Sequence, residues 1–75
     1  MKKRIIYTDH ALKQMEARGI TRAQVQRAIL GPDVELPGNN PGTLRLHKRV
    51  SGGRELQVIY KPKKSVDLVI TACWR

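Results

Sequence analysis

Residues 8–31 have the sequence TDHALKQMEARGITRAQVQRAILG, and they carry the start and stop signals of two helices. Thr8 predicts the N-cap of a first helix of about three turns, since a threonine hydroxyl accepts a backbone hydrogen bond at that position. Gly19 predicts the end of this helix, because glycine adopts the left-handed conformation that closes helices. The stretch therefore begins with one short amphipathic helix.

A second helix is predicted directly after the first. Thr21 and Gln24 form the Thr-x-x-Gln capping box, in which each side chain bonds the backbone N–H of the other residue. Ile20 before the cap and Val25 after it form a hydrophobic staple. Gly31 and the proline that follows it predict the end of this second helix.

Alternating apolar and polar residues predict strands in the rest of the chain. The longer segments are 43–50, 55–61 and 66–75, and shorter ones lie at 3–7 and 34–36. Turn residues at 51–53 and 62–65 join the longer segments into an antiparallel meander, and residues 37–42 form a loop. We expect an α+β fold of one domain (1–75), with two N-terminal helices packed on one face of an antiparallel sheet of three to four strands.

The side chains of the last strand are predicted to alternate without interruption between the two faces of the sheet. The inward-facing set is Val66, Leu68, Ile70, Ala72 and Trp74. Tyr60 of the preceding strand is expected to face the same core.

The charge of the chain points to a polyanionic partner. The 75 residues include 15 Lys and Arg against 6 Asp and Glu, which gives a formal net charge of +9. The positive electrostatic field of such a chain attracts nucleic acids whatever their base sequence, because phosphates that Lys and Arg neutralise release their counterions. RNA is the expected partner and DNA the alternative. A role of the charge in solubility or in binding an acidic protein remains open.

Several classes of site and location are disfavoured by composition. Cys73 is the single cysteine, so an internal disulfide is excluded and a structural metal is not expected; no cofactor is expected either. The apolar stretch at residues 5–7 is too short for a signal peptide or a membrane span. A cytoplasmic location is expected, and the oligomeric state stays open.

The polar face of the segment 43–50 is the strongest candidate for a functional surface. Arg45, His47 and Arg49 project to one side at two-residue intervals, roughly 7 Å apart. A guanidinium binds phosphate oxygens with its planar fork, and an imidazole transfers protons near neutral pH. The predicted nucleic-acid-binding set is Arg45, His47, Lys48, Arg49, Arg54, Lys61, Lys63 and Lys64. The alternative is a solvated sheet face whose charges discourage edge pairing.

His10 is a second candidate for proton transfer. In the first turn of a helix its positive charge is disfavoured by the helix dipole, and a neutral imidazole can serve as a general base. The alternative is a structural histidine that packs at the start of the helix and bonds Thr8 or the backbone.

Three short motifs carry a resemblance to a known family. They are Thr8-Asp9-His10-Ala11 with Met15, Arg18-Gly19-Ile20-Thr21 with Val25, and the final Thr71-Ala72-Cys73-Trp74-Arg75 after an Arg- and Lys-rich hairpin. With these motifs the chain resembles, over nearly its whole length, a family of small bacterial proteins of unknown function. Such proteins are similar in layout to RelE/ParE-type toxins, in which two N-terminal helices pack on an antiparallel sheet whose open face acts on RNA or another target.

The resemblance implies an activity and a partner. Some RelE-like toxins cleave RNA without a metal ion, so the implied function is a RelE-like toxin or a toxin-derived RNA-binding protein, with an acidic antitoxin as partner. The residues implied for this chemistry are His10 or His47 for proton transfer and Arg45, Arg49 and Arg75 for charge. A noncatalytic nucleic-acid-binding module and a protein-interaction domain that docks an acidic partner are the alternatives.

Overall fold

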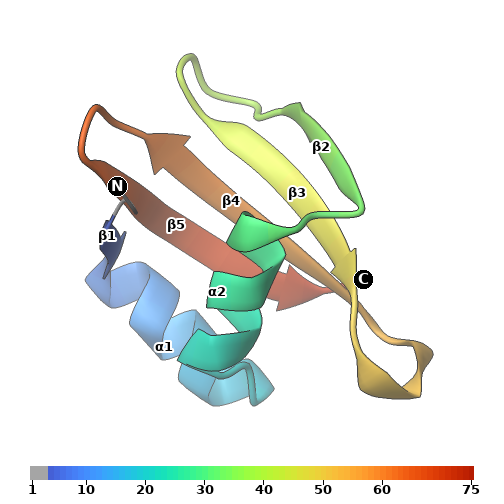
Figure 1. Cartoon of the computed structure of the whole chain (residues 1–75). Helices are drawn as coiled ribbons and strands as arrows, with labels where there is room; N and C mark the ends of the chain where they lie inside the picture. Colours follow the sequence, from blue (N-terminus) through green and yellow to red (C-terminus); the bar gives the residue numbers. More distant parts are fainter. Residues whose placement is uncertain (1–3) are drawn as a thin grey trace.

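A layer of two helices covers one face of a five-stranded sheet in the computed structural model, which describes residues 4–75 (Figure 1). The elements are β1 (Arg4–Tyr7), α1 (Asp9–Arg18), α2 (Arg22–Leu30), β2 (Val34–Pro37), β3 (Leu44–Arg49), the 3₁₀ turn η1 (Ser51–Gly53), β4 (Glu55–Pro62) and β5 (Val66–Trp74). The strand order is β1-β5-β4-β3-β2. The predicted α+β class is confirmed.

Both helices begin where their capping residues predict. The Thr8 hydroxyl accepts a hydrogen bond from the Ala11 backbone N–H at 3.0 Å. Both bonds of the capping box are present, because the Gln24 N–H donates to the Thr21 hydroxyl at 3.1 Å and the Thr21 N–H donates to Gln24 Oε1 at 2.9 Å. Gly19 ends α1 with a φ of 67°, a left-handed conformation that glycine adopts without strain.

The sheet is mixed and larger than expected, so the prediction of an antiparallel sheet of three to four strands is wrong in these two respects. β1 pairs in parallel with β5, with Ile5 opposite Asp67 and Tyr7 opposite Val69. The two helices form the start of the long connection that separates these strands in sequence, and parallel neighbours require such a connection. Of the predicted segment 3–7, Lys3 lies outside the described residues.

A β-bulge interrupts the pairing of β4 with β5. Ile59 lies opposite Thr71, whereas Tyr60 lies opposite Val69, so Ile70 is the extra residue of the bulge. The Thr8 hydroxyl donates to the Ile70 carbonyl at 3.3 Å. The residue that caps α1 therefore also contacts the irregular point of the sheet.

The bulge changes which side chains of β5 face the core. The predicted uninterrupted alternation is wrong, because Asp67, Val69 and Ala72 are buried whereas Val66, Leu68 and Ile70 are half-buried. One extra residue reverses the alternation between Val69 and Ala72. A local pattern of apolar residues does not reveal such a shift.

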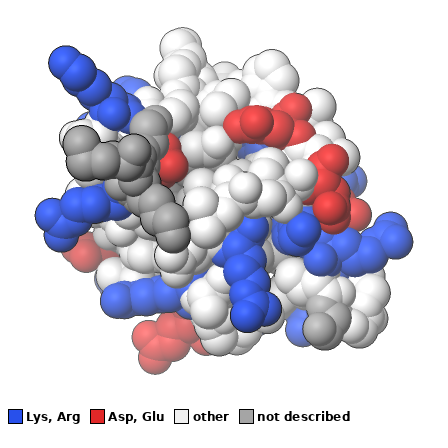
Figure 2. All heavy atoms as spheres, in the orientation of Figure 1, with Lys and Arg blue, Asp and Glu red and all other residues white. Residues whose placement is uncertain are grey.

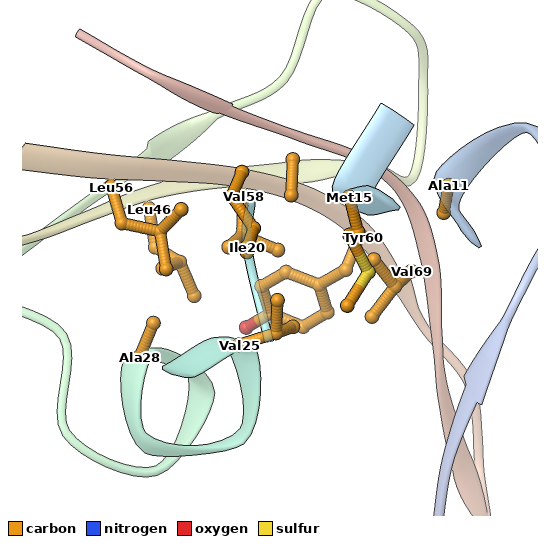
Figure 3. Close-up of a cluster of buried hydrophobic side chains, with 11 residues drawn as sticks. Ala11, Met15, Ile20, Val25, Ala28, Leu46, Leu56, Val58, Tyr60 and Val69 are labelled. Atoms are coloured by element: carbon orange, nitrogen blue, oxygen red, sulfur yellow. The ribbon is translucent and has the colours of Figure 1, made fainter. Parts of the chain in front are cut away.

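The core lies between the helices and the sheet, and Figure 3 shows helix side chains facing strand side chains. Its buried members are Ala11, Met15, Ile20, Val25, Ala28, Leu46, Leu56, Val58, Tyr60, Val69 and Ala72. Each large aliphatic side chain removed from water contributes roughly 1.5–3 kcal/mol. Both helices are used on this one face, so the opposite face of β3 and β4 has no helix over it (Figure 1).

The end of α1 is fastened to the end of β5 by two hydrogen bonds. Trp74 Nε1 donates to the Arg18 carbonyl at 2.7 Å, and Arg18 Nη1 donates to the Ala72 carbonyl at 2.9 Å. The Arg54 guanidinium lies 3.9 Å from the centre of the Trp74 ring, a cation–π contact. The Arg-Gly-Ile and Trp-Arg motifs therefore have a structural role in joining the two ends. Within residues 4–75, neither helix has the length and apolar character needed to cross a membrane.

Candidate functional site

Strand β3 separates the core from the candidate site. Leu46 is fully buried under the helices, and Arg45, His47 and Arg49 alternate with the inward-facing residues of this strand. The facing residues on β4 are Ile59, Gln57 and Glu55, respectively. The three predicted side chains thus share the face that the helices leave uncovered.

His47 is the centre of a hydrogen-bonded cluster. Its Nε2 lies 3.0 Å from Gln57 Oε1, and its Nδ1 lies 3.1 Å from Arg75 Nη1 and 3.4 Å from Glu55 Oε1. Arg75 Nη1 also lies 3.1 Å from Glu55 Oε1. These partners leave His47 only 7% exposed, so the imidazole is covered by its neighbours on the open face.

The partners of the two ring nitrogens define the tautomer. A guanidinium can only donate, so Nδ1 accepts from Arg75, and the Gln57 carbonyl oxygen accepts from a hydrogen on Nε2. An imidazolium would instead direct its Nδ1 hydrogen to Glu55 Oε1. With Arg75 Nη1 at 3.1 Å, Nδ1 is the acceptor, and it can donate to Glu55 only when Arg75 moves away.

Arg75 and Glu55 connect the ends of β4 and β5. The Arg75 N–H donates to the Glu55 carbonyl at 2.8 Å, and the side chains of the two residues form an ion pair. The Arg75 side chain is 52% exposed and that of Glu55 34% exposed. Both groups are thus within reach of a molecule that approaches the open face.

A hollow of about 580 Å³ opens beside this cluster. It is lined by Asp33, Val34, His47, Arg49 and Glu55. Its lining contains carboxylates as well as a guanidinium, so its charge is mixed. The hollow is suited to proton transfer between an imidazole and a carboxylate more than to the binding of several phosphates.

Arg45 lies next along the same face, two residues from His47. Its Nε is the one buried side-chain nitrogen or oxygen in the described part of the chain that has no hydrogen-bond partner. Buried donors normally have a partner. This unsatisfied donor distinguishes Arg45 from the surface arginines.

Asp33 joins the start of β2 to the end of β3. Its Oδ2 accepts from the Arg49 N–H at 2.8 Å, and its Oδ1 lies 3.7 Å from Lys48 Nζ. The hydrogen bond from Arg49 and the nearby charge of Lys48 lower the pKa of Asp33, although partial desolvation opposes them.

The lowered pKa predicts how Asp33 contributes to stability. A carboxyl whose folded-state pKa lies below its unfolded-state value stabilises the fold fully above the unfolded value, and loses this contribution as the pH falls through the folded value. We expect wild-type protein to be more stable than Asp33→Asn at neutral pH, and the difference to shrink in acid. Urea unfolding of both proteins across this range measures it, and a difference that is constant or grows toward acid pH would contradict the prediction.

The other predicted residues do not join this cluster. His10 is exposed in the first turn of α1, in the helix layer, so it does not meet His47 on the opposite face. Arg54 is exposed and stacks on Trp74. Lys48 points to the other side of β3 from His47 and pairs with Asp33.

Lys61, Lys63 and Lys64 lie at the opposite end of the sheet. Lys61 is exposed near the end of β4 and Lys63 and Lys64 are exposed in the turn that follows it, whereas Glu55 begins β4 beside the His47 cluster. The length of β4 separates the two ends by roughly 23 Å. The expected extension of one basic patch to these lysines is therefore not seen.

Glu55 and Gln57 are the site residues that the sequence prediction missed. The signal for them was present, because they alternate with Leu56 and Val58, which are fully buried. A short turn at residues 51–53 also brings Glu55 opposite Arg49. Among residues 4–75, no group of three or more His, Cys, Asp or Glu side chains is arranged to hold a metal ion.

Comparison with known proteins identifies a family but no characterised relative. No curated protein and no solved structure matches the chain. Residues 7–74, from the end of β1 to the end of β5, match the family described as a domain of unknown function, DUF4258. The match covers both helices and the whole of the His47 cluster except Arg75, and the chain therefore belongs to the DUF4258 family.

Proposed function

We propose that this protein binds RNA on the open face of the sheet and cleaves it without a metal ion, as a RelE-like toxin or a ribonuclease derived from one. The observation that carries the proposal is the cluster of His47, Glu55 and Arg75 on a hollow that Arg49 also lines. An imidazole, a carboxylate and guanidinium groups together supply the acid, the base and the cations for phosphodiester cleavage. The two helices on one face of the sheet support the RelE/ParE-like layout.

The proposed reaction uses the 2′-hydroxyl of RNA as nucleophile. The Glu55 carboxylate takes the proton of the 2′-hydroxyl, and the resulting oxygen attacks the adjacent phosphorus. The P–O5′ bond breaks, and the His47 imidazolium gives its Nδ1 proton to the leaving 5′ oxygen. Arg75 and Arg49 stabilise the additional negative charge of the phosphorane. The products are a 2′,3′-cyclic phosphate and a 5′-hydroxyl.

Access of the substrate to His47 depends on Arg75. In the free protein Arg75 Nη1 donates a hydrogen bond to Nδ1 of the imidazole. The arginine side chain is long and half exposed, so it can move to another acceptor. A phosphate in the hollow competes with the imidazole for the Arg75 guanidinium. The phosphate is the stronger acceptor, because it is charged and the imidazole that accepts from Arg75 is neutral. Binding of the phosphate therefore draws Arg75 from Nδ1. Nδ1 then takes up a proton from water, facing Glu55 Oε1, and this is the proton that His47 gives to the leaving 5′ oxygen.

A noncatalytic RNA-binding module is the second candidate, and one observation favours it. Both ring nitrogens of His47 already have protein partners, as in a histidine that only stabilises the ends of β4 and β5. In this case the arginines bind phosphates by charge and no bond is broken. An acidic protein that covers the basic residues is compatible with either function.

The two functions differ in the products formed from RNA. We expect the purified protein to cleave single-stranded RNA in the presence of EDTA, to leave 2′,3′-cyclic phosphate ends, and to arrest growth when expressed in bacteria. DNA of the same sequence, which lacks the 2′-hydroxyl, is the matched substrate control and should stay intact. RNA that is bound but never cleaved would support the noncatalytic module, and the absence of both binding and cleavage would reject both functions.

A further inference from the structure

A second, more strongly basic groove lies on the other side of β3 from the His47 cluster. It runs between α2 and β3 and is lined by Gln24, Arg27, Lys48, Arg49 and Val50. Its ionisable lining groups are Arg27, Lys48 and Arg49, which are all cations. The hollow at His47 differs, because the carboxylates of Asp33 and Glu55 lie on its wall.

The groove and the hollow are adjacent because Arg49 lines both. The paired residues of β2 and β3 extend only to Val34 and His47, so Lys48 and Arg49 continue beyond the ladder with β2. Figure 2 shows Lys and Arg side chains gathered beside α2 and this end of β3, with carboxylates toward β2. A chain molecule can therefore contact the groove and the hollow at the same time through Arg49.

The groove and the hollow differ in charge, so we expect them to bind different parts of the substrate. A phosphate in the hollow meets two carboxylates as well as the Arg49 cation, whereas the ionisable groups it meets in the groove are cations alone. Lys48 is partly neutralised by Asp33, so the charges available there are those of Arg49 and of Arg27, which is exposed on α2 and lines only the groove. We therefore expect the groove to contribute more to the affinity for RNA, and the hollow to be the site where the bond is cleaved.

We propose that the groove between α2 and β3 binds a backbone phosphate of single-stranded RNA that neighbours the phosphate cleaved at His47. This inference rests on the proposed function and adds Arg27 as a phosphate-binding residue. Because Arg27 and Arg49 line the same groove, one phosphate of a strand can bind Arg27 while Arg49 contacts the next. The substrate strand then passes around the end of β3 and reaches the hollow in a fixed direction.

The test measures the binding of a fluorescent 2′-O-methyl oligoribonucleotide of about 12 nucleotides, a typical length for a single-stranded site. This probe lacks the free 2′-hydroxyl, so it reports binding without cleavage. Arg27→Ala should lower the affinity by about tenfold, since it removes a charged contact to phosphate. It should also reduce the slope of log affinity against log salt by about 0.7, the value for one phosphate of a single strand.

The matched control is Arg22→Ala, which removes the same charge from the same helix at a residue that instead stacks on Tyr7 with a separation of 5.5 Å. Arg22→Ala should change affinity and slope little, and Arg27→Lys should recover most of the salt slope. Equal effects of Arg27→Ala and Arg22→Ala would overturn the inference while leaving the cleavage assay as a separate test of the proposed function. A larger effect of Arg27→Ala on polyglutamate binding than on RNA binding would also overturn it, since the groove would then serve an acidic protein. Absence of RNA binding by wild-type protein would reject the proposed function itself.

Discussion

For the proposed mechanism we expect His47→Ala to slow RNA cleavage by about 10²–10⁴-fold, the range for loss of a general acid. The reason is geometric, because Nδ1 is the ring nitrogen that faces Glu55 and Arg75 at the edge of the hollow. Single-turnover cleavage of a labelled RNA, with protein in excess, measures the chemical step apart from product release. Affinity for the 2′-O-methyl probe should fall far less than the rate, since arginines supply most of the attraction.

Glu55→Gln provides an independent view of the same step. Glutamine has nearly the shape of glutamate and retains an acceptor for Arg75, but it does not take a proton from the 2′-hydroxyl. We expect a rate loss of similar order, about 10²-fold or more. The double variant should be little slower than either single variant, because groups that act as a unit in one step are strongly non-additive.

The control for both variants is His10→Ala, which removes the other histidine of the chain from an exposed position on α1. It should leave cleavage unchanged. Since His47 is buried, thermal unfolding of each variant must show that the fold persists. Glu55 is partly exposed, which makes its variant the safer one. Full activity of both Glu55→Gln and His47→Ala, or an equal loss in His10→Ala, would remove the basis of the proposed mechanism.

The sequence predicts the helices well because their signals are local. Thr8, Gly19, Thr21 and Gln24 specify caps through bonds that span only three or four residues, and the structure contains them. The parallel pairing of β1 with β5 joins Arg4 to Val66, and no local pattern encodes a partner so distant along the chain. The bulge at Ile70 is unpredictable for the same reason, since it depends on how β5 meets β4.

The candidate site also contains residues that local patterns predict and residues that depend on tertiary pairing. The common face of Arg45, His47 and Arg49 follows from the two-residue period of a strand, and the hairpin register adds Glu55. Arg75 meets His47 only because β5 returns beside β4, so its place in the cluster depends on tertiary pairing. His10 falls outside the cluster since both helices cover the opposite face of the sheet.

The largest expected effect on stability comes from the residue before His47. Leu46→Ala should lower the free energy of unfolding by about 2–5 kcal/mol, because Leu46 is fully buried between the helices and the sheet (Figure 3). A domain of 75 residues has a total stability of roughly 4–11 kcal/mol. The substitution therefore removes a large share of the stability and raises the unfolded fraction strongly.

Leu30→Ala is the matched control, since it makes the same chemical change at the end of α2 where the leucine is 67% exposed. It should change stability by less than about 0.5 kcal/mol, as for surface substitutions in general. Urea unfolding followed by the fluorescence of Trp74 measures both variants, and equal losses would contradict the assignment of the core to the helix-facing side of β3.

Because Leu46 and His47 point to opposite faces of one strand, the loss of this packing also releases the strand that positions the imidazole. We therefore expect Leu46→Ala to reduce RNA cleavage in proportion to the unfolded fraction, and His47→Ala to reduce it in a protein that remains folded.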